Sequence, residues 1–317
     1  MAQPPPTDIP TAFRVFPDTL PQQNFDHAID SVGQPIFPIE IAEYIIDQLG
    51  IDLLFIFTSG EFGEFDHHAS LCLSLRNCAL TCKAWRPRSY YYLYRQIWLD
   101  SRVVDVLRKN VELCKSVHRL IFLGSLTPVR GLLPLTGPGK LSSIRALSFV
   151  GCTDMVQHKY FPMAFMPFSH TITVLTLLGM SLNGRDYHRI LCALPSLACL
   201  TTKYDIPDVS PPNQTGVKGL KAPKCRLKCL AIHISPGKPE RLCGFLTSIP
   251  CCISALESLL IRFPKPGTTD LWPNSGNVYN LIAASFVTLR TFAISFSGSL
   301  DVREKCVRKI SLHLSKW

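Results

Sequence analysis

The hexapeptide Ile144-Arg145-Ala146-Leu147-Ser148-Phe149 is the most informative part of the sequence, because its spacing of apolar residues recurs along the chain. An apolar residue is followed by a second three positions later and by a third two positions after that. Complete copies begin at Val117, Ile144, Ile172, Leu227, Leu256 and Leu289, and Leu197-x-x-Leu200 is a partial copy. The central residues stand at 120, 147, 175, 200, 230, 259 and 292, with intervals of 25 to 33 residues. Intervals of this length predict a protein built from structural repeats.

Each copy has the spacing of a short strand. Residues two apart on a strand face the same side, while the residue three positions earlier leads into it, so each copy buries its apolar side chains against the next. Helix-like stretches at 103–111, 186–194 and 241–246 lie between several copies. The sequence therefore predicts an α/β solenoid with a parallel sheet on its concave face. An ordinary doubly wound α/β domain is the alternative, and it would need less regular spacing.

These copies resemble leucine-rich repeats. That family places Asn or Cys three positions after the third apolar residue, and here only Cys152 fits. The other copies have Ser125, Met180, Ser235, Pro264 and Ser297 at that position. We therefore expect an irregular arc whose turns differ in shape. The segment from Asp205 to Lys224, rich in proline, glycine and lysine, is expected to replace a helix with a long loop.

Two helices are predicted before the repeats. Pro38 suits a first helical turn, and apolar residues follow on one face. They are Ile39, Ala42, Ile45, Ile46 and Leu49. A second helix is expected from a cap near Asp66, with Leu71, Leu75, Cys78 and Cys82 sharing a stripe. Residues 50–68 between them are expected to form an inserted loop. From periodicity alone, a generic helical hairpin packed on a larger domain explains this region equally well.

One string in this region is more specific than its periodicity. Residues 78–89 read Cys-Ala-Leu-Thr-Cys-Lys-Ala-Trp-Arg-Pro-Arg-Ser. With the opening Phe37-Pro38-Ile39-Glu40, this string resembles the F-box, in particular the F-box-like type of fungi, although Phe37 stands where that family usually has Leu. The resemblance implies that residues 36–95 bind the small Skp-family adaptor of a cullin-RING ubiquitin ligase. The residues implied to bind it are Pro38, Ile39, Ile45, Leu49, Leu75, Cys82 and Trp85.

Composition divides the chain into three parts. A composition of 47% hydrophobic and 18% charged residues is typical of a folded protein. The length of 317 residues predicts more than one structural unit. Residues 1–35 are a proline-rich leader, expected to be disordered or extended. Residues 36–95 form the F-box-like part and residues 96–317 the solenoid. Without a secretory signal or an apolar run of membrane-spanning length, we expect a cytoplasmic or nuclear protein whose thirteen cysteines are reduced.

Charge is unevenly distributed along the sequence. Residues 1–70 hold 11 acidic residues and only Arg14 as a base, so the remainder carries a net charge of +20. A basic cluster stands beside the predicted long loop at Lys218, Lys221, Lys224 and Lys228, together with Arg226. The positive charge of such a cluster is suited to binding an acidic protein surface or the phosphates of a nucleic acid. Because no stacking aromatics accompany it, we expect a protein partner and not nucleic acid.

Motifs for catalysis and for metal binding are not found. Residues 137–141 contain Gly-Lys but lack the remaining residues of a phosphate-binding loop. The pairs Cys78-x3-Cys82 and Cys225-x3-Cys229 fit zinc ligand spacing only loosely, and packing explains both. We therefore expect no enzyme, cofactor or metal. The F-box resemblance implies a substrate-recognition subunit with a cullin scaffold and an unknown protein substrate. The alternative is a free-standing leucine-rich-repeat scaffold that binds protein or nucleic acid without a ligase role.

Overall fold

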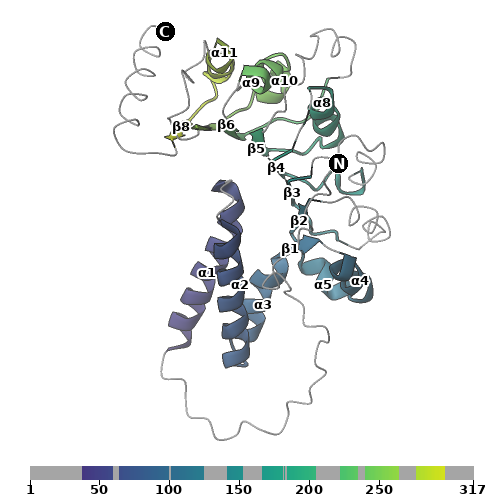
Figure 1. Ribbon diagram of the computed structural model, residues 1–317, viewed down its shortest axis with the longest axis vertical. Coiled ribbons are helices and arrows are strands. Elements are labelled where there is room, and N and C mark those ends of the chain that lie inside the picture. The colour runs from purple at the N-terminus through teal and green to yellow at the C-terminus, as the bar shows by residue number, and fades with distance from the viewer. Residues whose placement is uncertain are drawn as a thin grey trace, which may run out of the picture.

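Parallel strands in sequence order form the frame of the molecule (Figure 1). The computed structural model describes residues 38–59, 64–99, 101–124, 141–152, 166–180, 182, 184–204, 222–234, 240–263 and 276–296. Its eight-stranded sheet comprises β1 (Gln96–Leu99), β2 (Arg119–Leu123), β3 (Ala146–Val150), β4 (Val174–Leu178), β5 (Cys199–Tyr204), β6 (Cys229–Ile234), β7 (Ser258–Phe263) and β8 (Thr291–Phe296). The predicted α/β class and parallel sheet are confirmed. A strand order without reversal contradicts the doubly wound alternative.

The repeating apolar positions of the sequence lie side by side in the sheet. The central residues of the seven predicted copies pair in register on neighbouring strands, in the order Leu120, Leu147, Leu175, Leu200, Leu230, Leu259 and Phe292. β1 adds a copy that the sequence analysis missed, Tyr94-x-x-Ile97-x-Leu99, with Ile97 opposite Leu120. The apolar period therefore predicted the register as well as the strands.

Helices cover the outer side of the curved sheet (Figure 1). They are α4 (Ser101–Lys109), α5 (Val111–Ser116), α8 (Gly184–Ala193), α9 (Glu240–Thr247), α10 (Pro250–Ile253) and α11 (Gly276–Ser285), with a 3-10 turn, η3 (Met166–Phe168). Leu107, Leu191, Leu246 and Leu281 of these helices share one core with the central strand residues. The helices predicted near 103–111, 186–194 and 241–246 are confirmed, with 103–111 divided between α4 and α5.

The partial copy at Leu197-x-x-Leu200 is incomplete because its third position is polar. Thr202 stands there, at the place of Leu177 in β4 and Ile232 in β6. Its side chain is fully buried, and Oγ1 lies 2.6 Å from the hydroxyl of Tyr187 in α8. A hydroxyl is tolerated in the core because it has this partner.

Three neighbouring strands are each followed by a glycine with a positive φ. Gly124, Gly151 and Gly179 follow the last residues of β2, β3 and β4, with φ of 58°, 64° and 60°, a region that favours glycine. The N–H of Gly124 donates to the carbonyl of Val150, which extends the ladder by one bond. These three strands are therefore followed by a glycine of the same conformation, and the expectation that the turns differ in shape stays a prediction, because residues 125–140 and 153–165 lie outside the described residues. Residues 205–221 of the predicted long loop lie outside the described residues.

The N-terminal region is helical over more of its length than predicted. α1 (Ile39–Ser59) continues through Gly50, and α2 (Glu64–Thr81) begins before Asp66, so the prediction of an inserted loop over 50–68 was wrong. Gly50 is buried inside a helix, where a Cβ atom would overlap the ring of Tyr92 in α3 (Arg86–Arg95). Glycine at this position allows α1 and α3 to pack closely, and α1 continues through it. Residues 1–37 and 60–63 lie outside the described residues.

This helical unit, α1–α3, packs on the concave face of the sheet. Ile46 and Leu53 of α1 and Leu75 of α2 share a second core with side chains of the first four strands. Those strand residues are Trp98, Ile121, Val150 and Leu178. Figure 1 shows the unit on the inner side of the arc, opposite the helices of the repeats. The sheet is therefore covered on both faces over β1–β4.

Candidate functional site

Helix α1 has an apolar face on each of two sides. Ile46 belongs to the second core between the helices and the sheet, and Ala42, one turn earlier, is also buried. Ile41, Tyr44 and Ile45 lie on another side and are 48%, 64% and 50% exposed. Residues three and four apart on a helix are neighbours, so these three side chains form one surface. A single apolar stripe was expected, and the exposed set is the additional surface that needs an explanation.

Helix α2 also exposes large apolar side chains. Leu73 and Leu80 are both more than half exposed and are seven residues apart, which places them on one side of the helix. Exposed Arg76 and Asn77 stand between them. Large exposed apolar residues thus occur on both helices of the pair.

The residues implied to bind the adaptor occupy different environments. Pro38, Ile39 and Ile45 are exposed at the start of α1. Leu49, Cys82 and Trp85 are partly buried, and Leu49 and Trp85 pack against the second core. Leu75 is 0% exposed, so it supports the helical unit and offers no surface to a partner. The sequence analysis missed Ile41 and Tyr44, whose apolar character off the predicted stripe was the available signal.

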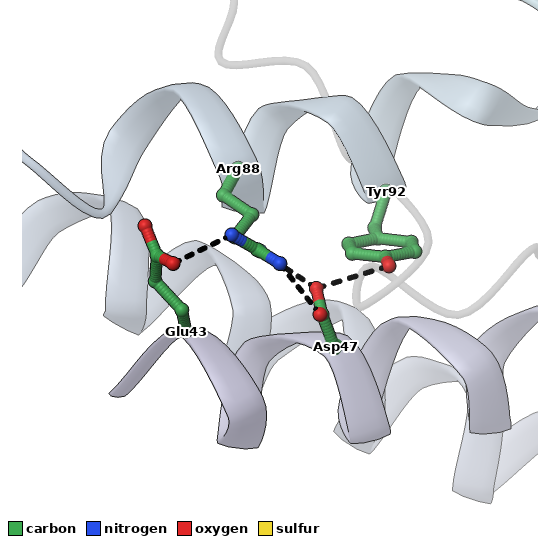
Figure 2. Close-up of polar contacts among 4 residues, drawn as sticks. All are labelled: Glu43, Asp47, Arg88 and Tyr92. Carbon is green, nitrogen blue, oxygen red and sulfur yellow. Dashed lines mark hydrogen bonds and ion pairs between the residues drawn. The ribbon is translucent and has the colours of Figure 1, made fainter. Parts of the chain in front are cut away.

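Arg88 joins α3 to α1 through two carboxylates (Figure 2). Its Nε and Nη2 donate to the two carboxylate oxygens of Asp47 at 2.7 and 2.6 Å, and its Nη1 lies 2.7 Å from Glu43 Oε2. The Tyr92 hydroxyl donates to Asp47 Oδ1 at 3.1 Å. The hydrogen bonds from Arg88 hold the pKa of Asp47 below its usual range. This bidentate arrangement fixes the position of α1, and with it the exposed apolar surface.

His68 of α2 joins the helical unit to the first strand. Its Nε2 accepts a hydrogen bond of 3.1 Å from the indole of Trp98, and the amide nitrogen of Gln96 lies 3.2 Å from the same atom. The proton of the neutral ring is then on Nδ1, which lies 3.7 Å from Sγ of Cys72. Burial, with a smaller effect of His67, lowers the pKa of His68 to about 3. The joint therefore contains a neutral imidazole at physiological pH.

Among the described residues, the second core reaches the concave face only at β1–β4. One row of side chains on this face is buried at Trp98, Ile121 and Ser148 under the helical unit. The same row is partly exposed at Leu260 of β7 and exposed at Ala293 of β8. Over the described strands, this row of the inner surface is thus more exposed at β7 and β8 than under the helical unit.

The predicted basic cluster is only partly within the described residues. Lys218 and Lys221 lie outside them. Lys224 and Lys228 are exposed, and Nζ of Lys228 is 3.8 Å from a carboxylate oxygen of Glu257 on the next repeat. The two described lysines lie before β6, at the edge where the strands begin, so they do not line the concave face.

The described residues contain neither a disulfide nor a group of metal ligands. The described cysteines are free thiols, including Cys225 and Cys252, whose sulfur atoms are 3.5 Å apart. Within the described ranges, no group of three or more His, Cys, Asp or Glu could hold a metal ion. In the same part of the chain, none of the helices has both the length and the apolar character needed to span a membrane.

The sequence matches no protein-family model, and no curated protein matches it either. Function is therefore argued from the residues and their arrangement.

Proposed function

We propose that this protein is the substrate-recognition subunit of a Skp-cullin-F-box type ubiquitin ligase, working in the cytoplasm or nucleus. α1–α3 bind the Skp-family adaptor, and the solenoid-like half binds a protein substrate. The observation that carries the proposal is the exposed apolar surface of Ile41, Tyr44 and Ile45 on α1. A cluster of exposed large apolar side chains commonly marks a protein interface.

Two further features support this assignment. The resemblance of residues 78–89 to the F-box gives the apolar surface a specific partner. The Arg88 network, with Asp47 and Glu43, holds α1 in place before any partner arrives, which lowers the ordering cost of binding. In the proposed complex the cullin scaffold and the other subunits supply the ubiquitin chemistry, so this chain needs no catalytic residues.

Adaptor capture by the full chain tests the proposal. Ile45→Glu places a charge in the exposed apolar surface, and we expect a loss of about 2 kcal/mol or more, roughly 30-fold in affinity. Val111→Glu is the matched control, because Val111 is 45% exposed in α5, outside the helical unit. Circular dichroism establishes that both variants are folded.

The outcomes separate the two candidate functions. Adaptor binding that Ile45→Glu weakens and Val111→Glu leaves unchanged supports the ligase role. A folded wild-type chain that does not bind the adaptor favours the alternative, a free-standing leucine-rich-repeat scaffold without a ligase role. Trp85→Ala is less specific, because Trp85 also packs against the core, and we expect it to lower both stability and adaptor affinity.

A further inference from the structure

Two cysteines face each other on neighbouring strands of the sheet. Cys199 is the first residue of β5 and Cys229 the first of β6, and the two are directly opposite in the parallel ladder. The residues that follow them, Leu200 and Leu230, belong to the core under the outer helices. Neighbours on a strand point to opposite faces, so both thiols point to the concave side. The Cys199 side chain is hydrogen-bonded to that of Cys229.

The two thiols differ in their access to solvent. Cys229 is exposed, whereas Cys199 is half-buried beside it. A reagent in solution therefore reaches Cys229 directly, and Cys199 lies next to any group that becomes attached there. Burial, and then the hydrogen bond with Cys229, raises the pKa of Cys199 to about 11. Because the thiolate is the reactive form of cysteine, the exposed Cys229 is the entry point of the pair.

The spacing of the strands permits a bond between these sulfur atoms. Neighbouring strands are about 4.7–4.9 Å apart, and a disulfide joins Cα atoms that are about 4.4–6.8 Å apart. Side chains stand roughly perpendicular to a sheet, so the two Cβ atoms are nearly as far apart as the strands, slightly more than the usual range of about 3.5–4.5 Å. A disulfide here would draw the strands together. Exposed or strained disulfides are the easily reduced ones, so the bond would be reversible.

A second pair of thiols provides an internal comparison. The sulfur atoms of Cys225 and Cys252 are 3.5 Å apart, but both side chains are fully buried. The backbone N–H of Leu227 donates to the carbonyl of Cys252 at 2.8 Å, which holds the segment before β6 against α10. Core packing explains this short distance. Proximity of sulfur atoms thus occurs twice in this region, and exposure to solvent distinguishes the pair on β5 and β6.

We propose that Cys199 and Cys229 form a reversible oxidation site on the concave face, with a low-molecular-weight disulfide such as glutathione disulfide as co-reactant. Cys229 loses its proton to solvent, and its thiolate attacks one sulfur of glutathione disulfide, which breaks that S–S bond and releases one glutathione thiolate. This thiolate takes the proton of Cys199. The Cys199 sulfur then attacks the mixed disulfide at Cys229, and the second glutathione leaves and takes a proton from solvent. Two protein thiols are oxidised to one disulfide, and one glutathione disulfide is reduced to two thiols.

The consequence of this reaction is local to the concave face. Oxidation replaces two thiol groups by one bond and joins two repeats covalently. In a reducing compartment both cysteines are thiols at rest, and disulfides that form there are mostly transient and redox-sensing. This part of the concave face would therefore respond to the ratio of glutathione to its disulfide. The site rests only on β5 and β6 and does not depend on the proposed ligase role.

Mapping of the oxidised cysteines in the full chain tests the proposal. The folded protein is reduced, freed of reductant and incubated with glutathione disulfide. Acid stops the reaction, and the unfolded chain is then alkylated, digested and analysed by mass spectrometry. We expect a peptide linked through Cys199 and Cys229 to form at least about tenfold faster than one linked through Cys225 and Cys252, because thiol reactivity follows exposure.

Single substitutions test the order of the two steps. Cys199→Ser removes the second thiol, so a mixed disulfide of glutathione with Cys229 should accumulate. Cys229→Ser removes the entry point and should lower oxidation of Cys199 at least about tenfold. Cys251→Ser is the matched control, because Cys251 is also exposed but lies outside the pair, and it should leave the link unchanged. Circular dichroism establishes that the variants are folded, and the mapping of the wild-type chain requires no variant.

Three results would overturn the proposal. One is the absence of a link between Cys199 and Cys229 in the folded wild-type chain, or a link between Cys225 and Cys252 that forms first. Another is a folded Cys199→Ser chain without glutathione at Cys229. The third is the same preference for the pair when the chain is oxidised in urea, because the pairing would then not depend on the sheet. The expected result in urea is a mixture of links without this preference.

Discussion

The indole N–H of Trp98 donates a hydrogen bond of 3.1 Å to Nε2 of His68, and this bond connects β1 to α2. The two rings meet edge-on, with their centroids 5.2 Å apart. Both side chains are buried, so water does not compete for the bond. Because Nε2 accepts the bond, the contact between the helical unit and the sheet requires His68 to be neutral.

Acid should destabilise this contact. The pKa of His68 is about 3 in the folded chain and about 6.5 when unfolded, so between these values the unfolded state binds more protons and stability falls as pH falls. At pH 5 the loss from His68 is about 2 kcal/mol relative to neutral pH. Urea unfolding at several pH values measures it. His68→Gln should flatten the dependence of stability on pH, and an unchanged slope would contradict the assignment.

Gly50→Ala should destabilise the helical unit although alanine favours helix. The added methyl overlaps the Tyr92 ring, and overpacking of this kind costs about 1–3 kcal/mol, more than the gain in helix propensity of at most about 1 kcal/mol. Chemical denaturation of the wild-type protein and of the variant measures the change in the free energy of unfolding. In the background Tyr92→Ala the ring is gone, so the same substitution should be neutral or stabilising. A destabilisation of equal size in both backgrounds would rule out the clash.

Ser148→Ala should stabilise the protein. The Ser148 hydroxyl is buried without a hydrogen-bond partner in the described part of the chain, and its removal relieves a cost of about 1 kcal/mol or more. Thr202→Val is the matched comparison, because its hydroxyl is buried with Tyr187 as partner. That change should destabilise by about 1 kcal/mol. Equal effects of the two substitutions in thermal unfolding would contradict this distinction.

All thirteen cysteines should be free thiols. The cysteines of the described ranges form no disulfide, and the sulfur atoms of Cys225 and Cys252 are 3.5 Å apart, a hydrogen-bond distance. Alkylation of the unfolded chain without reductant, followed by mass measurement, should add thirteen groups. Stability should not fall when reductant is added. Several blocked cysteines would indicate that the protein folds in an oxidising compartment.

The strands could be predicted because their apolar residues repeat. Around Leu120, Leu147 and Leu175 the apolar residues have the local spacing of a strand. The three leucines also recur at intervals of about one repeat, which allows their strands to stack side by side. β1 was missed because its copy begins at Tyr94, within the last turns of α3, and is thus read as a helix. Gly50 was misread for a different reason. Its role depends on Tyr92, 42 positions later in the chain, and no local pattern reveals that contact.

The candidate sites were predicted less completely than the fold. Lys224 and Lys228 were predicted to belong to a basic cluster because their charges are close in sequence, yet they do not lie on the concave face. Cys199 and Cys229 are separated by about one repeat, so only the register of the sheet brings them together. Similarly, Leu75 fits the adaptor-binding stripe by spacing, but burial against the sheet decides its role.

The direct passage from Arg95, the last residue of α3, to Gln96, the first of β1, leaves no linker between the helical unit and the sheet. With α1 and α2 also packed into the arc, movement at that junction would disrupt a core. Partners bound to α1 and to the far end of the sheet would therefore keep a constant separation and orientation. For a ligase subunit, such rigidity limits which lysines of a captured protein can reach the transferring enzyme. Selection among those lysines would then be a matter of geometry, and lengthening the chain between residues 95 and 96 would broaden it.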